Sequence, residues 1–149
     1  MKSTVPGAPI EVLLVEDNVD DAALTRRALE QAKVHNRVHH VTSGVEALAF
    51  LRREGRFAGA QPPDLILLDL NLPDMTGIEI LKRVKENKYL KATPVVVLTT
   101  TDDSHEIKRC YEHGCNVYIT KPVNYESFAN AIRQLGLFFS VIQVPPAAK

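Results

Sequence analysis

The sequence lacks the features that would place it among nucleic-acid-binding, membrane or secreted proteins. Lys and Arg number 18, as do Asp and Glu, so no net charge attracts nucleic acid or an anionic membrane. No apolar run approaches the roughly 20 residues that span a bilayer. Residues 1–9 contain prolines and a glycine but not the apolar core of a signal peptide. We expect a cytoplasmic protein with no nucleic-acid or membrane partner, in which residues 1–9 are a flexible tail.

Motifs for common cofactors are also missing. The two cysteines, Cys110 and Cys115, do not form C-x-x-C and are expected to be small apolar residues, not a disulfide. Neither G-x-G-x-x-G nor G-x-x-x-x-G-K-[ST] occurs, which argues against a nucleotide enzyme. His105 and Glu106 begin a zincin-like string, but Arg109 stands where the second histidine belongs. Zinc is therefore not supported.

Apolar strand-like runs alternate with helical patterns along the chain. With 149 residues, 45% apolar and 24% charged, the chain can bury the core of one globular domain. Five βα pairs with short connections predict a parallel sheet with helices on both faces. Right-handed crossovers favour the flavodoxin-like strand order 2-1-3-4-5. The predicted strands cover residues 10–15, 37–42, 65–69, 94–98 and 116–120.

The first predicted helix ends near Lys33. We expect Leu24, Ala28 and Ala32 to form its apolar stripe. Asp20 and Asp21 stand in its first turn, where acidic side chains favour the positive end of the helix dipole. We interpret both acids in this way.

The most informative stretch is the apolar run 65–68, which ends in Asp69. A continuous apolar run of this length indicates a strand buried on both faces. A carboxylate is costly inside such a strand unless it is paired or metal-bound. At the carboxyl end of the strand it can face the crevice where open α/β sheets bind ligands. We therefore expect Asp69 to be the working residue.

The other strand ends supply the groups that Asp69 would need. In a parallel sheet, Glu16, Asp17, Thr99 and Lys121 share one edge with Asp69. Three crowded carboxylates repel one another, and a hard cation relieves that repulsion. Mg²⁺ prefers oxygen ligands and often shares them with phosphate. With a lysine and a hydroxyl added, the set suits a transferring phosphoryl group, for which Asp69 would be the nucleophile.

Four segments together carry a family resemblance. They are Val15-Glu16-Asp17-Asn18, Leu68-Asp69-Leu70-Asn71-Leu72-Pro73 with Gly77, Pro94-Val95-Val96-Val97-Leu98-Thr99, and Tyr118-Ile119-Thr120-Lys121-Pro122. Thr99 follows Asp69 by 30 residues, and Lys121 follows Thr99 by 22. In these segments and spacings, residues 10 to about 135 resemble the receiver domain of two-component response regulators.

The resemblance implies a role for each matched acid. Asp69 would accept a phosphoryl group from a phosphohistidine on a sensor histidine kinase. Asp17, Asp69 and the backbone carbonyl of Asn71 would hold Mg²⁺. Glu16 would act mainly through a bound water. Receivers often carry an aspartate at this position, and the glutamate side chain is longer by one methylene group.

The resemblance also implies a phosphoryl-binding and switch set. Lys121 would pair with the phosphoryl group, Thr99 would swing to hydrogen-bond it, and Tyr118 would move inward behind Thr99. Thr100 stands beside this set, where receivers usually carry a small residue. The bond between Lys121 and Pro122 is expected to be cis, as in the family.

The end of the chain is unusually apolar. The resemblance implies a receiver domain over residues 10–136, and the last helix uses most of the 28 residues after Lys121, so we expect a stand-alone receiver. Residues 137–149 would form an apolar extension that needs a partner. Its dimer candidates are Phe138, Phe139, Val141 and Ile142. Single-domain receivers that serve bacterial phytochrome kinases look similar in this extension and in a long loop before the third strand, here residues 55–63. A downstream phosphotransfer protein is a further possible partner.

Two other functions remain open at this stage. Asp69-Leu70-Asn71 is similar to the D-x-D motif of haloacid-dehalogenase-type phosphatases, but Asn71 cannot act as their general acid. A receiver-like scaffold that is never phosphorylated is the second alternative. The complete set of Asp17, Asp69, Thr99 and Lys121 argues against it.

The apolar extension makes the oligomeric state testable. We expect a homodimer built from the last two helices, the last strand and residues 137–149. Size-exclusion chromatography with light scattering should give the mass of a dimer for the full chain at tens of micromolar. A monomer at that concentration would reject the dimer.

Overall fold

The computed structural model describes residues 9–32 and 35–135. The strands are β1 (Ile10–Val15), β2 (Asn36–Val41), β3 (Leu65–Asp69), β4 (Val95–Thr99) and β5 (Val117–Thr120). The helices are α1 (Val19–Gln31), α2 (Gly44–Arg52), the short 3₁₀ helix η1 (Gly55–Phe57), α3 (Gly77–Glu86), α4 (Ser104–Glu112) and α5 (Tyr125–Leu135). The apolar extension and its four dimer candidates lie outside the described residues.

The five strands form one sheet with the predicted flavodoxin-like order. β2, β1, β3, β4 and β5 lie side by side, and every neighbouring pair is parallel. The register pairs Val15 with Leu68, Asp69 with Leu98, and Thr99 with Thr120. The carboxyl ends of the four strands β1, β3, β4 and β5 therefore meet at one edge of the sheet.

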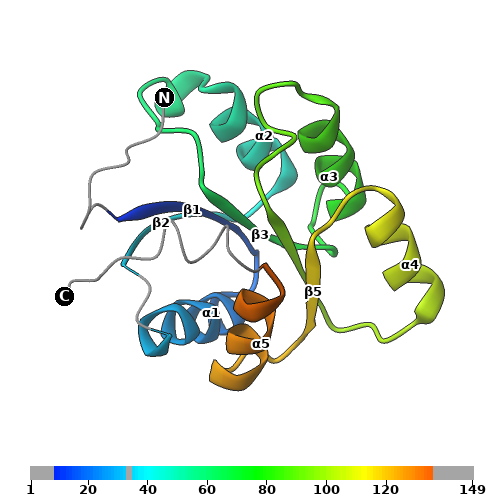
Figure 1. The fold of residues 1–149 in the computed structure, drawn as a ribbon. Coiled ribbons are helices and arrows are strands. Elements are labelled where there is room, and N and C mark those ends of the chain that lie inside the picture. Colours follow the sequence, from blue (N-terminus) through cyan, green and yellow to red (C-terminus); the bar gives the residue numbers. More distant parts are fainter. Residues whose placement is uncertain (1–8, 33–34, 136–149) are drawn as a thin grey trace.

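Helices cover both faces of the sheet. Figure 1 shows α1 and α5 together on one face, and α2, α3 and α4 on the other. Alternate residues of β3 serve the two cores: Leu67 belongs to the core that contains Phe128 of α5, and Leu68 belongs to the core that contains Leu81 of α3. Burial on both faces explains why the strand sequences are continuously apolar. Among the described residues, no helix has both the length and the apolar character needed to cross a membrane.

The predicted apolar stripe of α1 is wrong at Leu24, whose surface is 38% exposed. The buried face consists of Ala22, Thr25, Ala28 and Leu29. Thr25 can be buried because its hydroxyl donates a hydrogen bond of 3.0 Å to the Asp21 carbonyl. The satisfied threonine therefore takes the inward position, and Leu24, one residue earlier, faces outward.

The start of α3 lies directly against the end of β3. The Gly77 N–H donates to the Leu70 carbonyl at 2.8 Å. A Cβ atom on Gly77 would lie 2.4 Å from the Asp69 carbonyl oxygen and 2.8 Å from Leu70 Cα. Both neighbours are backbone atoms, so the approach requires glycine. This contact fixes the chain on the carboxyl side of Asp69.

A polar cluster lies at the opposite end of the sheet, where strands β4 and β5 begin. Lys85 of α3 donates to the Thr93 carbonyl at 2.8 Å and to the Lys91 carbonyl at 3.1 Å. Asn116 Oδ1 accepts from the Val95 N–H at 2.8 Å and lies 3.4 Å from Lys85 Nζ. The starts of β4 and β5 are thereby tied to α3.

Gly77→Ala should destabilise the fold because its methyl group would overlap backbone atoms of β3. We expect a loss of about 1 to 3 kcal/mol in the free energy of unfolding, measured by urea denaturation. Gly59→Ala is the matched control, because a Cβ atom on Gly59 would have nothing within 4 Å of it. Its free energy should stay within about 1 kcal/mol of wild type. Equal losses in both variants would contradict the close approach at Gly77.

Candidate functional site

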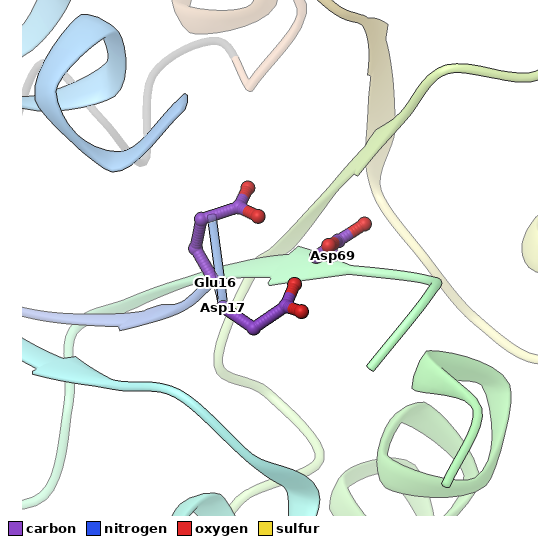
Figure 2. Close-up of side chains that lie close together, drawn as sticks. All are labelled: Glu16, Asp17 and Asp69. Atoms are coloured by element: carbon purple, nitrogen blue, oxygen red, sulfur yellow. The ribbon is translucent and has the colours of Figure 1, made fainter. Parts of the chain in front are cut away.

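Three carboxylates converge at the carboxyl edge of the sheet (Figure 2). Glu16 and Asp17 directly follow β1, and Asp69 is the last residue of β3. One ligand atom from each lies within 4.8 Å of the others. Glu16 and Asp69 are buried, whereas Asp17 is exposed. The structure thus brings together the three acids predicted from the strand ends.

Backbone groups orient these acids. Glu16 Oε2 accepts the Asn18 N–H, and Asp69 Oδ1 accepts the Asn71 N–H, each at 3.2 Å. His40 of β2 lies with Nε2 2.7 Å from the Glu16 carbonyl oxygen. A carbonyl only accepts, so Nε2 carries the proton. The β1–α1 loop is therefore held from the neighbouring strand as well as from its own turn.

Lys121 brings a positive charge into this cluster. It follows β5, its bond to Pro122 is cis, and its side chain is only 7% exposed. Its Nζ lies 2.8 Å from Glu16 Oε1, 3.0 Å from Asp21 Oδ2 and 3.4 Å from Asp69 Oδ2. One ammonium thus joins β5 to β1, α1 and β3.

The Glu16 carboxyl holds its proton more tightly than an ordinary glutamate. Burial is the largest cause and raises the pKa of Glu16 to about 7. The Lys121 ammonium opposes this rise, and the charge of Asp69 adds to it. Burial lowers the pKa of Lys121, but the hydrogen bonds and charges of the neighbouring acids raise it by more. The pKa of Lys121 is therefore above its ordinary value. Three carboxyl groups thus contact one ammonium, and Asp17 adds a fourth acid beside them.

The acid cluster has the donor set of a site for a hard cation. Glu16 Oε1 is buried and has no hydrogen-bond partner of normal geometry among the described residues, although Lys121 lies close to it. Carboxylate oxygens at this separation suit Mg²⁺ or a similar ion. A groove of about 440 Å³, lined by Asp17 and residues 70–76, opens beside the acids and includes Asn71. The residues present fit the predicted metal.

The remaining predicted residues lie at or next to the ends of β4 and β5. Thr99 is buried, and its Oγ1 accepts the Thr101 N–H at 3.1 Å. Thr100 is exposed. Tyr118 is partly buried, and its ring meets Tyr111 of α4 edge-on with 6.1 Å between centroids. The structure places Thr99 on the strand beside β3 and Tyr118 on the edge strand.

Two acids at the site were not predicted as parts of it. The sequence pattern indicates only a helix-dipole role for Asp21, yet Asp21 binds Lys121. Asp74 accepts the N–H groups of Gly44 at 2.8 Å and Val45 at 2.9 Å, so it ties the β3–α3 loop to the start of α2. These N–H groups lower the pKa of Asp74. In the sequence both resemble ordinary turn and cap acids, and no motif distinguishes them.

Comparison with known proteins identifies the class. Residues 12–133 match the family described as the response regulator receiver domain. The sequence is 36% identical to the response regulator Rcp1 of Synechocystis sp. over 140 residues, covering 94% of this chain and 95% of that protein. The chain belongs to the response regulator receiver family.

Solved structures give a finer placement within that class. The bacteriophytochrome response regulator RtBRR is 41% identical with a TM-score of 0.82, covering 94% of this chain and 86% of its own. The phosphorylated cyanobacterial phytochrome response regulator RcpA is 40% identical with a TM-score of 0.77, covering 94% of this chain and 100% of its own. The chain is therefore a receiver homologous to phytochrome response regulators.

The raised pKa of Glu16 predicts a pH-dependent stability without metal. The folded state holds a proton that the unfolded state releases from pH 4.5 upward, so stability falls as pH rises from about 4.5 to about 7. Glu16→Gln removes this contribution. The difference in free energy of unfolding, Glu16→Gln minus wild type, should therefore rise by about 1 to 3 kcal/mol between pH 4.5 and pH 7. It is measured by urea denaturation in the presence of a chelator.

The matched control is Glu79→Gln, an exposed glutamate paired with Arg83 on α3. Its difference from wild type should change little over the same pH range. A Glu16→Gln difference that is flat with pH would contradict the raised pKa.

Proposed function

We propose that this receiver accepts a phosphoryl group on Asp69 from a sensor histidine kinase, in a Mg²⁺-dependent reaction, and signals through protein contacts. The observation that carries the proposal is the buried Asp69 carboxylate with the Lys121 ammonium at 3.4 Å and two further acids beside it. Membership of the receiver family supports it. In Rcp1, a relative, a Mn(2+)-bound form has been solved, which supports a divalent cation here.

The geometry favours one oxygen of Asp69 as the nucleophile. Oδ1 accepts the Asn71 N–H, whereas Oδ2 lies on the Lys121 side. Oδ2 would attack phosphorus as the bond from phosphorus to the phosphohistidine nitrogen breaks. The electron pair returns to that imidazole, and Asp69 becomes an acyl phosphate. Lys121 would neutralise the phosphoryl oxygens, and the Thr99 hydroxyl would donate to one of them.

The metal set would consist of Asp17, Asp69 and the Asn71 carbonyl, with Glu16 acting through water. Bound Mg²⁺ would screen the negative charge of the acids and of the incoming phosphate. Thr100 is exposed beside Thr99, where its bulk would limit access of water and donor. Water attack on the acyl phosphate would return the protein to its resting state, and this self-dephosphorylation is the extent of its catalysis.

The partners follow from the relatives. A bacterial phytochrome kinase is the proposed phosphodonor, because RtBRR and RcpA are described as phytochrome response regulators. We propose a cytoplasmic homodimer in which Tyr118 and residues 137–149 report the phosphorylation state. A downstream phosphotransfer protein is the proposed output partner. An unphosphorylated scaffold is the alternative. Asn71 and the receiver family membership disfavour a phosphatase.

Phosphorylation of Asp69 is directly testable. The purified protein is incubated with a small-molecule phosphodonor, with and without Mg²⁺, and then read by intact mass. Wild type should gain one phosphate only with Mg²⁺, and Asp69→Asn should gain none. Asp20→Asn is the matched control, because Asp20 is an exposed acid in the first turn of α1. It should be phosphorylated like wild type.

A failure of wild type with the small donor leads to a second trial with a broad panel of sensor kinases. If every kinase also fails, phosphorylation is rejected and the scaffold function is favoured. Phosphate on Asp69→Asn would show that the acceptor is another residue.

A further inference from the structure

Among the described residues, Asp21 is the one acid touching Lys121 that the proposed reaction does not use. The two residues lie 100 positions apart in the sequence, and Lys121 Nζ donates to Asp21 Oδ2 at 3.0 Å. The other two acids near Nζ, Glu16 and Asp69, belong to the metal-binding cluster. Asp21 is outside that cluster. Its carboxylate therefore stays available to the ammonium when a cation draws on the other two.

The first turn of α1 fixes the position of Asp21. Its N–H donates to Oδ1 of Asn18, the N-cap residue, at 2.9 Å. Its carbonyl accepts from the buried Thr25 hydroxyl at 3.0 Å. The backbone is thus held on both sides, while the carboxylate reaches Lys121 with 27% of its side-chain surface exposed. This carboxylate is a fixed anchor that remains in contact with solvent.

Glu16 and Asp69 have other partners in the proposed reaction. Glu16 and Asp69 would face the bound cation, and Asp69 would also become an acyl phosphate. Both changes reduce the negative charge of these carboxylates, so their electrostatic attraction to the Lys121 ammonium decreases. A four-carbon lysine side chain without an anchor samples many rotamers, and ordering it costs entropy.

We propose that Asp21 is a positioning residue that keeps Lys121 beside Asp69 while Glu16 and Asp69 are engaged with the cation and the phosphoryl group. This inference rests on the proposed function. Asp21 acts through Lys121 and does not touch the phosphoryl group. It accelerates phosphoryl transfer by holding the ammonium where charge develops on the phosphoryl oxygens.

Asp20 provides a matched control for Asp21. Both stand in the first turn of α1, so replacing either with Asn removes the same charge from the same helix end. Asp20 is exposed and makes no side-chain hydrogen bond or ion pair with any described residue. Asp21→Glu retains a carboxylate and tests rescue.

The first measurement is the maximal rate of phosphorylation by a saturating small phosphodonor with saturating Mg²⁺. Asp21→Asn should slow it about fivefold, the effect of a partly exposed ion pair, while Asp20→Asn stays at the wild-type rate. Asp21→Glu should recover at least half of the loss. Thermal midpoints of all variants are recorded beside the rates.

The second measurement does not depend on phosphorylation. In a ¹⁵N-lysine NMR spectrum with Mg²⁺, the Lys121 ammonium should give a slowly exchanging signal, assigned by its loss in Lys121→Arg. The signal should persist in Asp20→Asn and disappear in Asp21→Asn. That result supports the anchor, since an ammonium that leaves its partner exchanges its protons with water.

The outcomes separate the two proposals. If wild type takes no phosphate from the small donor or from sensor kinases, the proposed function fails and this inference falls with it. If wild type is phosphorylated but Asp21→Asn matches Asp20→Asn in rate and retains the Lys121 signal, this inference alone is overturned. A slower rate explained by an equally lowered thermal midpoint, with the signal intact, also overturns it.

Discussion

The structure at the carboxyl edge of the sheet depends on one buried ammonium. Lys121 lies within 3.4 Å of oxygens from Glu16, Asp21 and Asp69. A lysine with a 7% exposed side chain is tolerated only with such partners, and the acids are tolerated only with a cation. Each partner comes from a different element, so the charge balance also fixes how β1, α1, β3 and β5 meet. With Asp17 as a fourth acid, the cluster has the oxygen ligands for a second cation.

Rigid neighbours keep the acids where the ammonium needs them. Gly77 lets α3 begin against the backbone of Asp69, and Asp74 ties the β3–α3 loop to α2. His40 holds the Glu16 carbonyl from β2. The acids that would bind metal are therefore supported by backbone contacts from three sides. Such support preserves their geometry against their mutual repulsion.

The sequence predicts the sheet order and the meeting of Glu16, Asp17 and Asp69, because these follow from strand ends in a parallel sheet. It does not predict that Leu24 faces outward, because the buried face of α1 includes Thr25, whose hydroxyl donates to the Asp21 carbonyl. The role of Asp21 was missed for another reason, because its partner Lys121 lies 100 positions away in the sequence. The clamp by Asp74 was missed because it depends on where α2 begins in space, 29 or 30 residues away in the sequence.

The ties from Lys85 and Asn116 give the sheet a mechanical asymmetry. They fasten the starts of β4 and β5 to α3, at the end of the sheet away from the acids. β4 is thus fastened at its start, whereas β5 is fastened at both ends, because Lys121 directly follows it. α4 follows the acid-bearing end of β4 and leads to Asn116 at the start of β5, so it connects the two ends of the sheet. Because the chain after α4 is fastened at Asn116, we expect a shift at Thr99 to move the N-terminal end of α4 more than its C-terminal end.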